Sequence, residues 1–90
     1  MKTAFLSPKE IRDKAALHAS LARQMDFPDW YGANLDALYD LLSASSERTT
    51  VVLLGSKGLA RQLGPDLDRL LTVLEDLRRE TGRVRVLRLP

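Results

Sequence analysis

Two carboxylates four residues apart, Asp36 and Asp40, are the residues best placed to do chemistry in this sequence. They lie in the stretch FPDWYGANLDALYDLL, residues 27–42, which contains no Lys or Arg. At helical spacing the two like charges repel each other, which costs an exposed helix about 0.2–0.5 kcal/mol. Paired acids can act as general acid and base, but they then need a cleft and groups that position a substrate. One helix face of a ninety-residue chain offers little of either, so a solvated helix face and a binding face remain as two interpretations.

The neighbours of these acids favour a binding face. Asp36 lies in the first turn of the predicted helix, where the helix dipole stabilises a negative charge. Asp40 lies one turn later, where the dipole no longer stabilises its charge. Tyr39 shares the outward face, and Trp30 and Tyr31 come just before the helix. Aromatic residues beside charges are common interface anchors, although we expect at least one of them, Tyr31, to fill the core. Nucleic-acid binders interleave aromatics with basic residues, whereas the acids here suit a cationic partner.

No other motif points to a stronger chemistry. His18 is the only histidine and has no paired nucleophile or second ligand, so we expect a structural histidine. There is no Cys, which excludes disulfides, thiolate metal sites and cysteine nucleophiles. The GSKG segment at 55–58 lacks the spacing of a P-loop, so a tight turn is expected there. The sequence therefore predicts no enzyme activity, no metal site and no cofactor.

Apolar segments with strand character alternate with helical segments along the chain. The run TTVVLL at 49–54 is β-branched and almost continuously apolar, which predicts a strand covered on both faces, as in parallel sheets. Strands separated by helices predict crossover connections. We therefore expect one α/β domain over residues 1–90, a small three-stranded parallel sheet with about four helices packed on it.

The element boundaries follow from capping and turn residues. The strands are expected at 2–6, 49–54 and 84–89. The first helix is expected to follow a Ser7–Glu10 capping box, with Asp13 as a second candidate cap, and to end before Pro28. Further helices are expected from the Asn34 cap to about 43, at 59–63 after the turn, and from Pro65 to Gly82.

The composition is that of a globular domain, with 44% hydrophobic and 29% charged residues. No apolar run is long enough to span a bilayer, and residues 1–10 lack the apolar core of a signal peptide, so we expect a cytoplasmic protein without membrane association. The net charge of +2 is unevenly distributed, since residues 24–47 carry five acids and no base, which leaves +7 elsewhere. Much of the positive charge lies near the end, at Arg78, Arg79, Arg83, Arg85 and Arg88.

The motif WYGANLDALYDLL, residues 30–42, closely resembles that of the barstar family, in which two aromatics and a Gly precede an Asn-Leu-Asp-Ala-Leu helix. An aromatic and a second Asp follow in that motif. The predicted order of strands and helices over essentially all ninety residues is also that of the family. Barstar-like proteins are intracellular inhibitors of small secreted ribonucleases of the barnase type. The resemblance implies the same fold and the same role for this chain.

The resemblance also implies roles for individual residues. Asp40 matches the acid that occupies the enzyme's phosphate-binding site, and Asp36 matches the acid beside it. Trp30 and Tyr39 match aromatics on the inhibitor's contact face. The other matches to the motif and to an acid of the long helix, all expected to bind the partner, are Tyr31, Gly32, Asn34 and Asp76.

The chain departs from the family in ways that bear on its partner. Family inhibitors are strongly acidic, whereas this chain carries +2, so steering toward a basic enzyme is expected to be weaker or confined to the acidic face. Ala33 stands where the family usually has an acid. The expected partner is still a small, basic, secreted ribonuclease, bound by a monomer that does not contact nucleic acid directly.

Two alternatives to the inhibitor stay open. One is a protein-binding module that uses the same acidic face on a basic partner that is not a ribonuclease. The other is an RNA-binding domain that uses the arginines of the last helix and strand, whose affinity for RNA would fall steeply with salt.

Overall fold

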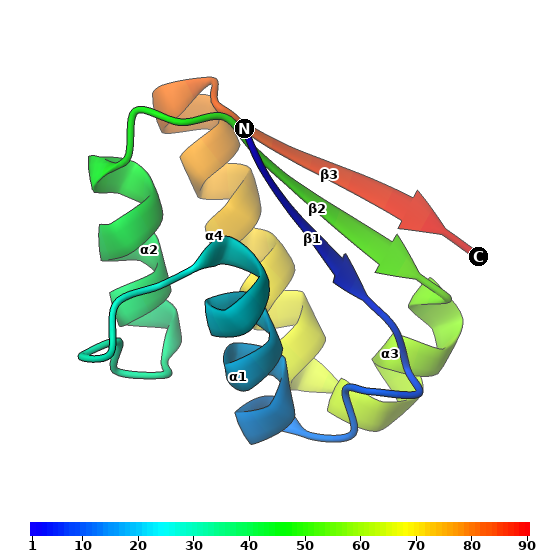
Figure 1. The fold of residues 1–90 in the computed structure, drawn as a ribbon. Coiled ribbons are helices and arrows are strands. Elements are labelled where there is room, and N and C mark those ends of the chain that lie inside the picture. The colour runs from blue at the N-terminus through cyan, green and yellow to red at the C-terminus, as the bar shows by residue number, and fades with distance from the viewer.

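Three parallel strands form one sheet, and four helices connect and cover them (Figure 1). The computed structural model describes residues 1–90. Strand order in the sheet is β1-β2-β3, the order of the chain. The α/β architecture, its three parallel strands and its four helices confirm the predicted fold. The elements are β1 (Lys2–Leu6), α1 (Lys14–Met25), α2 (Leu35–Ala44), β2 (Thr49–Leu54), α3 (Ser56–Leu63), α4 (Pro65–Thr81) and β3 (Val84–Leu89).

The two faces of the sheet differ, because the helices gather on one side of it (Figure 1). Side chains alternate between faces along each strand, so Val51 and Leu53 of β2 point toward the helices and are fully buried. On the other face, Phe5, Val52 and Leu87 lie side by side in register across the three strands. Phe5 is 50% exposed and Leu87 is 41% exposed. The prediction that β2 is covered on both faces was therefore wrong, since its outer residue Val52 is shielded by these strand neighbours and not by a helix.

The start of α1 also differs from one of the two predictions. The helix begins at Lys14, and the side chain of Asp13 accepts a hydrogen bond from the Ala16 N–H at 2.8 Å. Ser7 does not cap it, because the backbone N–H groups of Glu10 and Ile11 both donate to the Ser7 carbonyl in a separate turn. That turn carries Ile11 into the core, where it is fully buried. Asp13, the second candidate cap, is confirmed.

The GSKG segment is the beginning of α3 and not a turn that ends at Gly58, because the helix already starts at Ser56. Gly55 has a φ of +82°, which favours glycine. A Cβ on Gly58 would lie 2.8 Å from Cγ of Pro8. Glycine at 58 is thus required for the close approach of the β1–α1 loop, and the segment has a packing role in place of a phosphate-binding one.

The edge of the sheet at β1 is closed by a side chain. Gln24 of α1 accepts a hydrogen bond from the Phe5 N–H at 2.7 Å and donates one to the Phe5 carbonyl at 2.9 Å. The same amide nitrogen donates to Ser20 Oγ at 2.8 Å, which fixes its orientation. Gln24 therefore attaches α1 to β1 through the two backbone groups that a further strand would use.

The core lies between the sheet and the helices and holds seventeen buried apolar residues in one cluster. Leu38 and Leu42 place α2 on this core, and α2 packs along α4. None of the four helices is long and apolar enough to cross a membrane.

Candidate functional site

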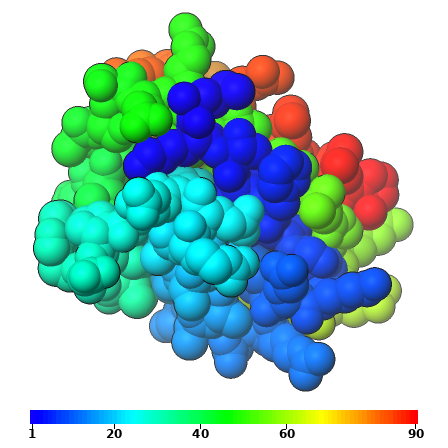
Figure 2. Space-filling model, viewed as in Figure 1, coloured from blue at the N-terminus to red at the C-terminus, as the bar shows by residue number.

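The loop of residues 26–34 and α2 form a continuous outer surface, seen at the left of the space-filling view (Figure 2). Asn34 joins the two parts, because its side-chain oxygen accepts a hydrogen bond from the Ala37 N–H at 2.8 Å and caps α2. Its amide nitrogen donates to the Gly32 carbonyl at 3.2 Å. The predicted cap at Asn34 is confirmed. It holds the loop and the first turn of α2 in one geometry.

Asp36 and Asp40 both point away from the core and are exposed. Neither carboxylate forms an ion pair with another residue of the chain. Leu38 and Leu42 lie on the opposite side of α2 and fix the helix against the core. The fold thus displays two uncompensated negative charges on a helix whose position is rigidly set.

Tyr39 connects this helix to α4, which sequence reasoning did not foresee. Its hydroxyl donates a hydrogen bond to the Glu80 carboxylate. The pKa of Tyr39 is raised, first by this hydrogen bond, then by burial and by the charges of Glu80, Asp76 and Asp40. The tyrosine is half-buried and packs against the core, so it does not simply share the outward face with the two acids.

Glu80 was missed because nothing in the local sequence of α4 separates it from the other exposed acids there. The signal lies in the tertiary packing of α2 on α4. Asp76, one helical turn earlier, forms an ion pair with Arg79 at 2.5 Å. Its charge contributes to the raised pKa of Tyr39, and Arg79 partly neutralises that charge.

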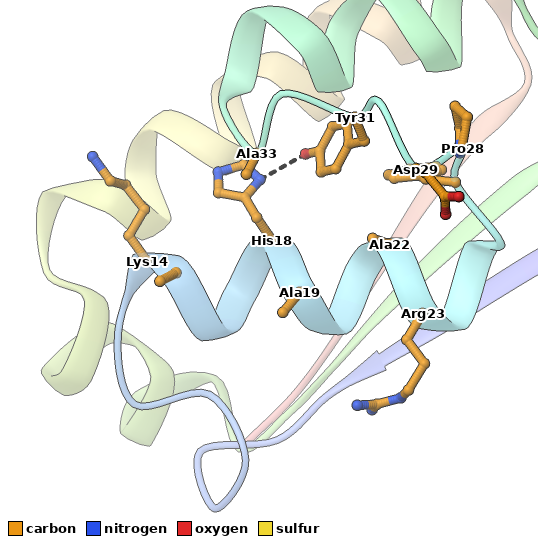
Figure 3. A pocket seen from close by; sticks show the side chains of 11 residues that line it. Lys14, His18, Ala19, Ala22, Arg23, Pro28, Asp29, Tyr31 and Ala33 are labelled. Atoms are coloured by element: carbon orange, nitrogen blue, oxygen red, sulfur yellow. Dashed lines mark hydrogen bonds between the residues drawn. The ribbon is translucent and has the colours of Figure 1, made fainter.

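The two aromatics of the loop differ in exposure. Trp30 is 77% exposed. Tyr31 is half-buried, with its ring 4.8 Å from the ring of Phe27, and its hydroxyl shares a hydrogen bond with Nδ1 of His18 at 2.6 Å (Figure 3). Burial raises the pKa of Tyr31 to about 12. The expected packing role of Tyr31 is confirmed, and its contacts leave Trp30 as the aromatic that a partner can reach.

Backbone geometry sharpens the turn before α2. Ala33 has a φ of +52°, a left-handed conformation that is costly for residues with a Cβ. A Cβ on Gly32 would come within 3.3 Å of the Asn34 amide nitrogen, so glycine gives that side chain room to bond the loop. Strain of this kind persists where surrounding contacts fix the backbone, and such positions cluster at functional sites.

His18 lies beneath the loop and is only 2% exposed. Burial lowers the pKa of its imidazole, and the charge of Lys14 lowers it further, against a smaller opposing effect of Asp66. The histidine is satisfied by Tyr31, as expected of a structural residue. No cluster of three His, Asp or Glu residues is arranged to hold a metal ion.

Three of the five C-terminal arginines are engaged within the fold. Arg78 pairs with Glu75 at 2.6 Å, and Arg79 pairs with Asp76. Arg83 donates to the Ser45 carbonyl at 2.7 Å. Arg85 and Arg88, on β3, are exposed and form no ion pair.

The fold is that of a small α/β domain with an acidic surface that carries an exposed aromatic residue, and comparison with known proteins places the chain in a family. The family described as "Barstar (barnase inhibitor)" matches residues 1–88, so the chain belongs to the barstar family. It is also similar to the Bacillus subtilis (strain 168) protein named "Putative ribonuclease inhibitor YrdF", with 32% identity over 81 residues, which covers 89% of each chain.

Proposed function

We propose that this protein inhibits a small ribonuclease by covering its active site with α2 and the preceding loop. Asp40 would occupy the position of a substrate phosphate, and Asp36 would add a second negative charge beside it. The observation that carries this proposal is the pair of exposed carboxylates with no ion-pair partner on a helix fixed by Leu38 and Leu42. Membership of the barstar family supports the same conclusion.

A ribonuclease active site offers the charges that this surface lacks. It holds phosphate with cationic side chains, and a carboxylate on a helix can enter such a site without being cleaved. The repulsion between Asp36 and Asp40 is then offset by the partner's positive charge. The inhibitor therefore needs no catalytic group, cofactor or metal of its own. It acts as a monomer in the cytoplasm on a small, basic enzyme that is normally secreted.

Other residues extend this contact surface on both sides of α2. Trp30 supplies an exposed aromatic anchor of the kind that dominates many interfaces. Tyr39, together with Glu80 and Asp76, forms an acidic edge where α4 meets α2. Glu80 contributes to this edge although the sequence alone did not single it out.

The proposal is tested by measuring inhibition of RNA cleavage by a panel of small basic ribonucleases. Wild-type protein is expected to inhibit one of them stoichiometrically. Asp40→Asn is expected to raise the inhibition constant by at least about 30-fold, since hot-spot residues contribute about 2 kcal/mol or more. Asp36→Asn and Trp30→Ala should weaken inhibition less. The matched control is Asp68→Asn, which removes an exposed acid on α4 away from this surface.

The outcomes separate the mechanisms. If Asp40→Asn inhibits as tightly as wild type and Asp68→Asn does too, the phosphate mimicry is wrong. If the folded wild-type protein inhibits no ribonuclease, the same surface is a binding module for another basic protein, the alternative that shares these residues.

A further inference from the structure

A groove runs along the outer side of α1, under the loop that carries Trp30 (Figure 3). Its volume is about 570 Å³. Figure 3 shows His18 and Ala22 pointing from α1 toward the loop, with the Tyr31 ring above them and Pro28 and Asp29 at one end. The groove shares the loop of residues 26–34 with the candidate surface but lies over α1 and not over α2.

The groove is apolar along its middle and already formed. Its floor consists of Ala15, Ala19 and Ala22, short side chains at positions of α1 that face away from the core. Phe27 and Tyr31 form its wall, and the hydrogen bond between Tyr31 and His18 fixes that wall. A ligand would therefore enter without having to order the site first.

The groove adjoins the surface assigned above to the ribonuclease. Asp29, Tyr31 and Ala33 line it, and these residues come from the same loop as Trp30. A typical stable interface uses about 20–30 residues on each side, with an apolar centre. Of the large apolar side chains that are exposed, only Trp30 lies on the loop or on α2. An enzyme large enough to cover the loop would reach the groove and find the missing apolar area there.

The two ends of the groove carry different charges. Lys14 lies at one end and forms no ion pair, whereas Asp29 and Arg23 lie together toward the other end (Figure 3). The contact of Arg23 with Glu10 is long, at 3.9 Å, between two exposed side chains. A cationic part of an enzyme surface would be repelled at the Lys14 end, so that end favours an occupant that carries negative charge.

We propose that the ribonuclease inserts an apolar side chain from the rim of its active site into this groove, with a neighbouring carboxylate directed toward Lys14. The inference rests on the proposed function and adds the chemistry of a second contact. The partner surface is then bipolar, cationic where it meets Asp40 and acidic where it meets α1.

Charge reversal at Lys14 tests this contact, because the contact and long-range attraction to a basic enzyme predict opposite changes in the inhibition constant. Making the inhibitor more acidic should strengthen binding to a basic enzyme wherever the changed residue is not in contact. Lys57→Glu, on exposed α3, is therefore expected to leave inhibition unchanged or tighten it slightly. Lys14→Glu is expected to raise the inhibition constant at least about fivefold, because it opposes the partner's carboxylate.

A steric pair of variants tests the apolar part of the same contact. Ala19→Trp places a large ring in the groove from an exposed position, and Ala60→Trp does the same on exposed α3 as the control. We expect at least a tenfold weaker inhibition for Ala19→Trp and less than a twofold change for Ala60→Trp. Circular dichroism and urea unfolding establish that each variant is folded.

The results overturn the groove contact and the inhibitor function separately. If Asp40→Asn loses inhibition while Ala19→Trp and Lys14→Glu inhibit as well as wild type, the enzyme does not occupy the groove and the proposed function stands. If wild-type protein inhibits no ribonuclease, the proposed function fails and the groove contact fails with it.

Discussion

The hydrogen bond between Tyr31 and His18 predicts a measurable cost for the removal of one oxygen atom. Tyr31→Phe keeps the ring and its packing 4.8 Å from Phe27 but removes the hydroxyl that lies 2.6 Å from Nδ1 of His18. The imidazole is 2% exposed, so water does not readily replace the lost partner. An unsatisfied buried polar group costs about 1–3 kcal/mol. For a domain of this size that corresponds to a fall in Tm of about 4–24 °C.

The assay is equilibrium unfolding in urea at neutral pH, followed by far-ultraviolet circular dichroism. Fluorescence is a poor probe, because Trp30, the only tryptophan, is already 77% exposed in the folded protein. Tyr31→Phe should lower the urea midpoint without changing the slope of the transition, since the surface exposed on unfolding is nearly the same.

A double-mutant cycle isolates the hydrogen bond from other effects of the substitution. His18→Leu removes the nitrogen that would be left without a partner, so in that background Tyr31→Phe should cost almost nothing. The expected coupling energy is about 1 kcal/mol or more. A Tyr31→Phe protein within about 0.3 kcal/mol of wild type would refute the reasoning, because it would mean that this bond does not support the loop.

Two further predictions concern the same loop region and the packing of α3. Because burial and the charge of Lys14 hold the pKa of folded His18 below its ordinary value of 6.5, the unfolded chain binds the proton more readily. The free energy of unfolding should therefore be highest above about pH 6.5 and should fall as the pH drops through the folded pKa. Urea titrations at several pH values should show a shallower fall for His18→Leu. Gly58→Ala should destabilise the protein by about 1–3 kcal/mol through overpacking, because the new Cβ would lie 2.8 Å from Pro8. In a Pro8→Ala background the loss should be smaller in thermal unfolding, because Cγ is removed, but it should not vanish, since the Cβ at position 8 would still lie 3.1 Å from the new Cβ.

The boundaries of the later elements could be predicted because clear capping and helix-terminating residues mark them. Pro65 and Gly82 enclose α4 as expected, and Asn34 begins α2 with a side-chain cap. The start of α1 was ambiguous, because Ser7 and Asp13 are both good caps in isolation. Only the burial of Ile11, a tertiary fact, decides in favour of Asp13.

The position of β2 could be predicted from the sequence, but which of its two faces meets the helices could not. The residues of β2 are the same type on both sides, so the sequence did not indicate that only one side meets helices. The outer side stays apolar because Val52 is central and its neighbours shield it, while the exposed area falls on Phe5 and Leu87.

The parts of the candidate site formed by residues close in sequence were predicted, whereas the contacts between distant segments were missed. Asp36 and Asp40 could be assigned to one exposed helix face from their spacing alone. Glu80 could not, since its link to Tyr39 joins residues 41 apart in sequence. The groove on α1 is also a product of assembly, because its floor and its wall come from different segments.

The amide of Gln24 has a consequence for how this protein behaves when crowded. Its donor and acceptor occupy the N–H and carbonyl of Phe5, so another chain cannot add to the sheet there without first displacing a side chain from its own helix. Only the β3 edge remains open to such an addition, and Arg85 and Arg88 lie along it. A second copy could therefore pair along β3 more readily than at Phe5 of β1. Gln24 thus limits the addition of a further strand at that point of the sheet.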